Sequence, residues 1–235
     1  MNLILLTDND FISASQVRLN DRRAEHIRTV HRADAGEVLL VGLIGGKIGY
    51  GTVEEINETS VSLAVTLERE PPKPLDLKLF LALPRPKYLA RCLQTATSLG
   101  VKQIYLMNSY RVEKMYWSCA QLAPAEINRA CLLGLEQARD TVLPTVHMKR
   151  LFKPFVEDEL PALIAGTTAV LAHPSAPTPC PFSLQGETSL AIGPEGGFID
   201  YEVQKLKEIG FQAVHTFERI LKVETALASL IGRLK

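Results

Sequence analysis

The chain has 235 residues, of which 46% are hydrophobic and 22% are charged, and its formal net charge at pH 7 is zero. This composition is ordinary for a globular protein with a real core, and the length suits one large domain or two smaller ones. A net charge of zero argues against a uniformly basic nucleic-acid-binding surface, so any RNA contact would depend on local clusters of charge.

The chain carries no sign of a membrane segment or of a disulfide framework. No apolar stretch approaches the roughly 20 residues of a membrane span, and the N-terminus does not resemble a signal peptide. The sequence therefore predicts no membrane partner and a cytoplasmic location. Four cysteines are scattered without a C-x-x-C pair, which favours free thiols and predicts no zinc or other metal site.

Residues 1–70 are predicted to form a small β-barrel. A first strand is expected at Leu3–Leu6, and a Gly45-Gly46 turn separates two of three further antiparallel strands. Those three strands are expected at residues 37–44, 47–56 and 60–67. This region holds 7 lysines and arginines against 11 aspartates and glutamates, so it is acidic on balance.

A short helix is predicted between the first two strands. Asn20-Asp21 can cap it, it ends near His31, and Ala24, Ile27 and Val30 fall on one side. The same segment is locally basic. A solvated helix face and a surface for RNA phosphates explain this charge about equally well; the second reading selects the residues Arg22, Arg23, Arg28 and Arg32.

Residues 71–74 are predicted to be a linker, because prolines there remove backbone hydrogen-bond donors. Beyond the linker, in residues 75–235, strands alternate with helices. The strands are expected at residues 76–83, 103–107, 168–172, 190–193 and 211–214, and the helices at residues 86–99, 124–139, 200–209 and 223–234. Such alternation predicts an α/β domain with a mostly parallel sheet and helices on both faces.

One of these strands runs into Gly193-Pro194-Glu195-Gly196-Gly197 just before a helix. Glycines allow positive φ angles and a close approach of the backbone to a ligand. The stretch is neither a Walker A loop nor a G-x-G-x-x-G fingerprint. On local chemistry a ligand-binding loop is somewhat favoured over a purely structural turn.

Three other stretches could carry chemistry. Arg219–Ala226 places Arg219 and Lys222 beside Glu224 and Thr225, although the last two could simply be residues that suit a first helical turn. Leu135–Arg139 could be an ordinary polar helix end. His173 follows a strand, at the edge of the sheet where ligands bind in α/β folds, but a lone histidine is more often structural.

Taken together, these stretches resemble a known family. Gly-Pro-Glu-Gly-Gly-Phe at 193–198, followed some twenty residues later by Arg-Ile-Leu-Lys-x-Glu-Thr-Ala at 219–226, is similar to the RsmE-like small-subunit ribosomal RNA uridine-N3 methyltransferases of the SPOUT superfamily. The segment around His26–Arg32 resembles the family's N-terminal PUA-like barrel, and Glu113-Lys114, Glu136-Gln137 and His173-Pro174 also have counterparts.

The resemblance implies an enzyme that methylates N3 of a uridine in 16S ribosomal RNA with S-adenosyl-methionine as cofactor. It implies a C-terminal SPOUT trefoil knot and a homodimer, with the apolar face of residues 223–234 as part of the dimer interface. The small ribosomal subunit or its RNA would be the partner. The barrel and its arginines would recognise that RNA.

The resemblance also implies which residues form the site. Glu195 is the candidate base, and Arg219 and Lys222 are candidates for stabilising negative charge on the target base or for binding phosphate. Three loops would bind the cofactor, through the residues Leu171, Ala172, His173, Gly193, Pro194, Glu195, Gly196, Gly197, Thr216, Phe217, Ile220 and Leu221.

The chain departs from the family at four positions. Phe217 stands where the family has glycine, Lys222 replaces an arginine, and Thr95 and Ser98 stand where lysine and glutamate are usual. One alternative is therefore an RNA-binding paralog with lost or altered activity. Another is an α/β enzyme that uses a different nucleotide, which would explain the glycine-rich loop but not Arg219–Ala226.

Overall fold

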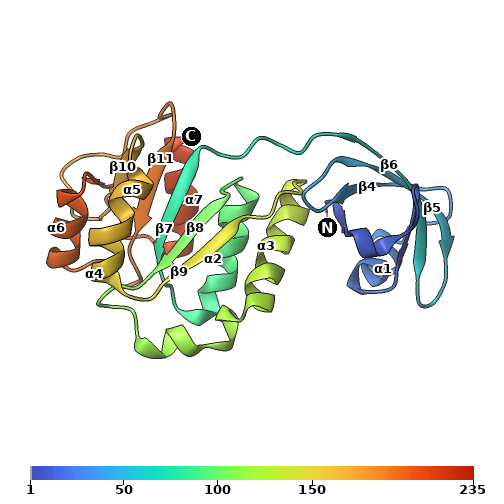
Figure 1. Ribbon diagram of the computed structural model, residues 1–235, viewed down its shortest axis with the longest axis horizontal. Coiled ribbons are helices and arrows are strands. Elements are labelled where there is room, and N and C mark those ends of the chain that lie inside the picture. Colours follow the sequence, from blue (N-terminus) through green and yellow to red (C-terminus); the bar gives the residue numbers. More distant parts are fainter. Residues whose placement is uncertain (1) are drawn as a thin grey trace. The chain divides into compact units, whose positions relative to one another are not determined.

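The structure is a computed structural model that describes residues 2–235, so residue 1 of the predicted first domain lies outside it, and it forms two compact units (Figure 1). The first unit comprises the residues up to Lys73 together with Leu132–Leu143, and the second comprises Pro74–Cys131 with Pro144–Lys235. The predicted second domain, 75–235, is continuous in sequence, whereas the structure assigns Leu132–Leu143 to the first unit.

The first unit is built on a six-stranded sheet of order β1-β4-β5-β6-β3-β2. The β4–β5 and β5–β6 pairs are antiparallel hairpins as predicted, and β1 pairs with β4 in parallel. Strands β2 and β3 were not predicted. The elements are β1 (Ile4–Leu6), η1 (Asp8–Asp10), β2 (Phe11–Ser13), β3 (Gln16–Leu19), α1 (Arg22–His26), η2 (Ile27–His31), β4 (Val38–Leu43), β5 (Ile48–Ile56) and β6 (Val61–Arg69).

The predicted helix over residues 20–31 forms with a change of winding. The Asp21 side chain accepts a hydrogen bond from the Arg23 backbone N–H, which caps α1, and the chain then continues as the π-helical turn η2. Ala24 and Ile27 are buried as expected, but Val30 is 64% exposed. The wider turn contains more residues than an α-helical one, so Val30 rotates away from the side that carries Ala24 and Ile27.

Two contacts explain why Leu132–Leu143 belongs to the first unit. Leu135 is fully buried in a cluster with Leu3, Leu5 and Ile48. Glu136 is buried and accepts hydrogen bonds from both terminal nitrogens of Arg22, at 2.5 and 3.2 Å. The polar residues near the end of the helix are thus used inside the first unit.

Arg23 is a structural residue, and the prediction that it contacts RNA is wrong. Its guanidinium donates to Asp10, to Asp21 and to the Leu5 carbonyl, so all five of its N–H groups have acceptors. Burial acts to raise the pKa of Asp21, but hydrogen bonds from the Arg23 side chain and backbone outweigh it and hold that pKa below its ordinary value.

The second unit contains the predicted strands and helices with small shifts at their ends, and it adds β9 and several short helices. The elements are β7 (Leu77–Ala82), α2 (Pro86–Ser98), β8 (Gln103–Met107), η3 (Lys114–Ser118), η4 (Ala120–Leu122), the first part of α3 (Pro124–Ala138), β9 (Thr145–Lys149), α4 (Phe152–Pro154), η5 (Phe155–Glu159), α5 (Leu160–Ile164), β10 (Thr168–Ala172), β11 (Thr188–Ile192), α6 (Asp200–Glu208), β12 (Gln212–Val214) and α7 (Val223–Leu234).

The sheet of the second unit has the order β12-β10-β11-β7-β8-β9, and every pairing between these strands is parallel. Helices α2 and α7 cover one face and α4, α5 and α6 the other (Figure 1). The α/β class with a parallel sheet is thereby confirmed. Leu89, Leu93 and Ala96 of α2 are buried as predicted, and no helix within residues 2–235 has the length and apolar character that crossing a bilayer requires.

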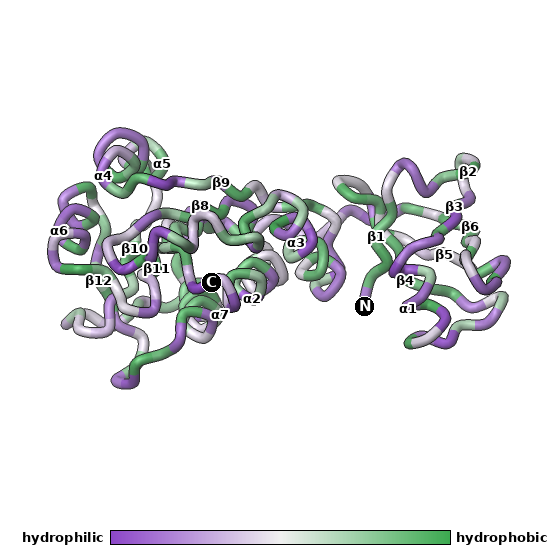
Figure 2. Tube along the Cα trace, turned by 90° about the horizontal axis from the view of Figure 1, so that it is seen from below, coloured by the Kyte–Doolittle hydropathy of each residue, from purple (hydrophilic) through white to green (hydrophobic). Residues whose placement is uncertain are grey.

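The apolar face of α7 is not available as the predicted dimer interface. Figure 2 shows the helix as predominantly hydrophobic, and its five large apolar side chains are at most 5% exposed within the single chain. These side chains belong to Val223, Leu227, Leu230, Ile231 and Leu234. The apolar face of α7 is therefore covered by other core residues of the same chain.

The Arg23 network should be essential to the stability of the first unit. Arg23→Ala leaves the Asp10 carboxylate buried without its cation, and we expect a loss of about 3–5 kcal/mol in the free energy of unfolding, measured by urea denaturation. Arg32→Gln, at an exposed arginine, is the control and should change stability by less than about 0.5 kcal/mol. Equal effects of the two substitutions would contradict the structural role of Arg23.

Candidate functional site

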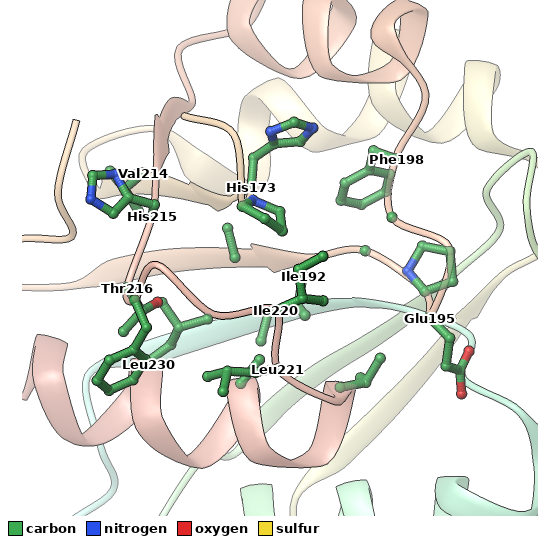
Figure 3. Close-up of a pocket in the computed structure, with 18 of the residues that line it drawn as sticks. His173, Ile192, Glu195, Phe198, Val214, His215, Thr216, Ile220, Leu221 and Leu230 are labelled. Atoms are coloured by element: carbon green, nitrogen blue, oxygen red, sulfur yellow. The ribbon is translucent and has the colours of Figure 1, made fainter. Parts of the chain in front are cut away.

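A pocket lies at the carboxyl edge of the parallel sheet, where the segments that follow β10, β11 and β12 come together. Parallel neighbours end at the same edge, so segments distant in sequence meet there. The first part of α7 closes the pocket, and Figure 3 shows Leu221 and Leu230 facing His173 and Phe198 across it. The lining residues are 172–174, 192–195, 197, 198, 214–217, 219–221, 223, 226 and 230.

Most of the predicted cofactor residues come together in this pocket. Ten of the twelve line it: Ala172, His173, Gly193, Pro194, Glu195, Gly197, Thr216, Phe217, Ile220 and Leu221. The other two do not line it, since Leu171 is buried within β10 and Gly196 faces Arg111. Of the predicted catalytic residues, Glu195 and Arg219 line the pocket, whereas Lys222 lies outside the lining, at the start of α7.

Several lining residues were missed by the sequence analysis. They are Pro174, Ile192, Phe198, Val214, His215, Val223, Ala226 and Leu230. Most of them lie at or just after the ends of strands or within α7, Phe198 lies just before α6, and most are apolar. Their proximity to the predicted motifs is a usable signal, but nothing in their chemistry distinguishes them from core residues.

The glycine-rich loop owes its shape to backbone requirements at two positions. Gly197 has φ of 74°, a region that L side chains rarely adopt, and its N–H donates to the Pro194 carbonyl at 2.7 Å. A Cβ at Gly193 would stand 3.0 Å from the backbone nitrogen of Phe198. The loop is therefore a tight turn in which Gly197 is required by its φ angle and Gly193 by lack of room for a side chain.

Two side-chain contacts fix the middle of this loop. The Glu195 carboxylate accepts a hydrogen bond from the backbone N–H of Arg85, at the start of α2, at 2.9 Å. The Arg111 guanidinium donates to the carbonyl of Gly196. Glu195 is exposed and directed toward α2, so the residue predicted as a base also anchors the loop (Figure 3).

A third anchor, Glu202, holds the end of the loop. This glutamate in the first turn of α6 is only 2% exposed. Its carboxylate accepts from the backbone N–H groups of Ile199 at 3.0 Å and Tyr110 at 2.7 Å, and from the Ser109 hydroxyl at 3.1 Å. It thereby ties the loop that follows β11 to the loop that follows β8.

The two histidines of the pocket are held by backbone contacts. The N–H of His173 donates to the Val214 carbonyl at 2.9 Å, which extends the β10–β12 pairing. Nδ1 of His215 lies 2.8 Å from the Ala176 carbonyl, and because a carbonyl can only accept, Nδ1 carries the proton. His215 therefore fastens the proline-rich loop that follows β10 to the end of β12.

The lining of the pocket is mainly apolar and carries little charge. Arg219 is the one lysine or arginine among its described lining residues and Glu195 the one acid. Phe217 and Ile220 at the pocket are 52% and 84% exposed. No group of three or more histidines, cysteines or acids in residues 2–235 could hold a metal ion.

A nearby cysteine is chemically inert. Burial, with smaller contributions from the charges of Glu224 and Glu195, raises the pKa of the Cys92 thiol to about 12. Because the thiolate is the nucleophile, Cys92 cannot serve as one at neutral pH. The site therefore offers backbone groups, apolar surface, one positively charged side chain and one negatively charged side chain.

Comparison with known proteins gives a consistent result. The family model described as RNA methyltransferase domain matches residues 71–235. The ribosomal RNA small subunit methyltransferase E of Treponema pallidum is 28% identical over 232 residues, which cover 96% of this chain and 87% of that protein. The ribosomal RNA small subunit methyltransferase E 1 of Borreliella burgdorferi is 23% identical over 230 residues, which cover 96% of this chain and 94% of that protein.

Two solved structures share the fold. A methyltransferase from Legionella pneumophila in complex with SAM has a TM-score of 0.75 at 21% identity, with 98% of this chain and 95% of that chain covered. A ribosomal RNA small subunit methyltransferase E from Neisseria gonorrhoeae bound to S-adenosyl methionine has a TM-score of 0.72 at 21% identity, with the same coverage.

Removal of the Glu202 carboxylate should loosen both loops that it joins. In Glu202→Ala the N–H groups of Ile199 and Tyr110 are left without their acceptor, and we expect a loss of at least about 2 kcal/mol in unfolding free energy. Hydrogen exchange should rise in residues 109–112 and 193–199. Glu208→Ala, at an exposed position of the same helix, should leave both unchanged; faster exchange there too would refute a specific anchor.

Proposed function

The chain belongs to the RNA methyltransferase domain family, and we propose that it transfers a methyl group from S-adenosyl-methionine to ribosomal RNA of the small subunit. The proposal is carried by one observation: three loops and the start of α7 form a single, mainly apolar pocket at the carboxyl edge of a parallel sheet. The names of the relatives supply the substrate class.

The pocket suits S-adenosyl-methionine better than a cofactor that carries phosphates. A phosphate-bearing nucleotide calls for several cations or a row of backbone N–H groups at a helix N-terminus, whereas this lining contains Arg219 alone. Apolar side chains such as Ile192 and Leu221 suit an adenine ring, and the glycine-rich loop lets backbone groups approach a ribose. When bound, the cofactor supplies an electrophilic methyl group.

We propose N3 of a uridine as the methyl acceptor, which rests on the family resemblance and on the names of the relatives. N3 lies on the Watson–Crick edge and carries a proton, so the target base must be unpaired and must lose that proton. The protein therefore has to hold an extruded or single-stranded nucleotide beside the pocket, and a group must accept the proton or stabilise the resulting anion.

Glu195 remains our candidate for the base and Arg219 for stabilising negative charge on the target. Oε1 of Glu195 accepts the Arg85 N–H at 2.9 Å, which leaves Oε2 as the oxygen that can take the proton. Arg219 is exposed and lines the pocket. Lys222 stands outside the lining, so we assign it to RNA phosphate.

The finer features of the family are also part of the proposal. We infer a PUA-like fold for the first unit, a trefoil knot around the 214–222 segment, a homodimer and a cytoplasmic location. Of the four arginines predicted to bind RNA, Arg23 is structural and Arg22 is bound to Glu136. Arg28 and Arg32 therefore remain as candidates on the first unit. Arg28 also donates to the carbonyls of Asn57 and Glu58.

A binding protein without activity is the second candidate, and the exposure of Phe217 argues against it. The bulky replacement of a family glycine would abolish cofactor binding if its ring filled the pocket. The ring is instead 52% exposed, so it stands at the mouth of the pocket. Ser98, at another divergent position, donates to the Thr95 carbonyl within its own helix.

Cofactor binding and methyl transfer test the function together. We expect the protein to bind S-adenosyl-methionine in calorimetry and to transfer labelled methyl to small ribosomal subunits at a uridine. Gly197→Ala strains the loop and should weaken cofactor binding about tenfold, since a left-handed L residue costs about 1–2 kcal/mol. Gly166→Ala, with φ of 77° and open space around it, is the matched control outside the pocket. No binding at millimolar cofactor would overturn the function.

The role of Glu195 can be separated from its role as an anchor. Glu195→Gln keeps an oxygen that can accept from Arg85 N–H but removes the carboxylate, whereas Glu195→Ala removes both. If Glu195 is the base, Glu195→Gln should lower kcat by about 10²–10⁴ with little change in cofactor affinity. A loss below about tenfold would leave Glu195 as an anchor only.

A further inference from the structure

A group of basic and aromatic side chains, exposed except for the half-buried Tyr116, lies next to the glycine-rich loop, outside the cofactor pocket. We call it the tyrosine–arginine surface and define it as Arg85, Tyr110, Arg111, Lys114 and Tyr116. Its members come from the start of α2, from the loop that follows β8 and from η3. None of them lines the pocket, and all belong to the second unit.

Hydrogen bonds join this surface to the loop of the pocket. Glu195 accepts from Arg85 N–H, and Arg111 donates to the Gly196 carbonyl. Tyr116 donates its hydroxyl to Glu113 at 2.6 Å. This bond, with burial and the charges of Glu113 and Glu195, raises the pKa of Tyr116, while the charge of Arg85 acts to lower it. The three segments therefore meet at one place beside the glycine-rich loop.

Tyr110 is the most exposed aromatic side chain of the group, at 79%. Its backbone is fixed, because its N–H donates to the buried Glu202 at 2.7 Å. An exposed ring on a rigid backbone provides a stacking platform at small entropic cost. Nothing in the internal packing of the protein accounts for a tyrosine at this place.

Two cations of the surface, Arg85 and Lys114, differ from Arg22 and Arg23 of the first unit, whereas Arg111 is bound to the Gly196 carbonyl. Within the part of the chain that the structure describes, the side chains of Arg85 and Lys114 form no ion pair, whereas Arg22 and Arg23 are bound to carboxylates. The neighbouring carboxylates of Glu113 and Glu195 accept from the Tyr116 hydroxyl and from Arg85 N–H, and these two negative charges are outnumbered by the three cations of the surface. Free positive charge beside an exposed ring suits a polyanion with stacking bases.

We propose that the tyrosine–arginine surface binds single-stranded RNA flanking the target nucleotide, with a base stacked on Tyr110 and phosphates held by Arg85 and Lys114. This inference rests on the proposed function, which requires an unpaired target beside the pocket. Aromatic platforms combined with basic side chains are how proteins hold single strands regardless of sequence. The surface thus places the strand next to the loop that carries Glu195.

The test uses the full chain and a fluorescein-labelled twelve-nucleotide oligouridine, with fluorescence anisotropy as the readout. Tyr110→Ala should weaken binding about tenfold, because it removes the platform for one stacked base, while Tyr110→Phe keeps the ring and should bind as the unchanged protein does. The double variant Arg85→Gln, Lys114→Gln should reduce the slope of log K against log salt by about 1.4, since each phosphate contact to a single strand contributes about 0.7.

Matched controls on the second unit make the result specific. Tyr201→Ala removes another exposed tyrosine, and Arg129→Gln with Lys153→Gln removes the same charge elsewhere. All of these should bind the oligouridine as the unchanged protein does. The proposal is overturned if Tyr110→Ala binds normally, if Tyr201→Ala is equally impaired, or if an RNA duplex binds as tightly as the single strand.

Calorimetry with S-adenosyl-methionine separates this inference from the proposed function. Tyr110→Ala and the double variant should retain normal cofactor affinity, because their side chains do not line the pocket. Normal cofactor binding together with unchanged RNA binding in the variants would refute the surface and leave the function intact. Absence of cofactor binding in the unchanged protein would refute the function itself.

Discussion

All strands of the second sheet run in the same direction, so each one delivers its following loop to the same edge. This is the constraint on which the rest of the unit depends. The loops after β10, β11 and β12 are separated by tens of residues in sequence, yet the pairing order β12-β10-β11 brings them into one pocket. Helix α7 then closes the pocket with residues that directly follow the last of these loops.

The loops at that edge are fixed by a small number of polar contacts. Glu202 is the clearest, because a single buried carboxylate satisfies donors from two loops and forms no ion pair within residues 2–235. Such a carboxylate is stabilised by its three hydrogen bonds rather than by charge. Two further contacts hold the same loop, from Arg85 N–H to the Glu195 carboxylate and from Arg111 to the Gly196 carbonyl.

The helices and strands of the second unit could be predicted well, because the sequence features that indicate them are local. Alternating strands and helices, the position of the glycines and the ends of strands each depend on a few neighbouring residues. The twelve cofactor residues came instead from the family resemblance, and ten of them line the pocket. Strand β9 and the short helices over 152–164 were missed because their composition gives no clear period.

The errors have a different cause, since they concern partners that are distant in sequence. Arg23 reads as one of several surface arginines until Asp10 and the Leu5 carbonyl are placed around it. The apolar face of α7 fits a dimer interface until α2 is packed against it. A charge or an apolar stripe can be identified in a sequence, but what neutralises or covers it is a property of the tertiary structure.

Because Leu132–Leu143 belong to the first unit, that unit cannot complete its folding early in synthesis of the chain. Leu135 completes the cluster of Leu3, Leu5 and Ile48, and Glu136 is the partner of Arg22. During translation, which proceeds from the N-terminus, the apolar side of the first unit stays uncovered until Leu143 has emerged. Folding of the first unit is therefore coupled to the emergence of β7, α2 and β8, and a fragment cut at Lys73 would expose that side permanently.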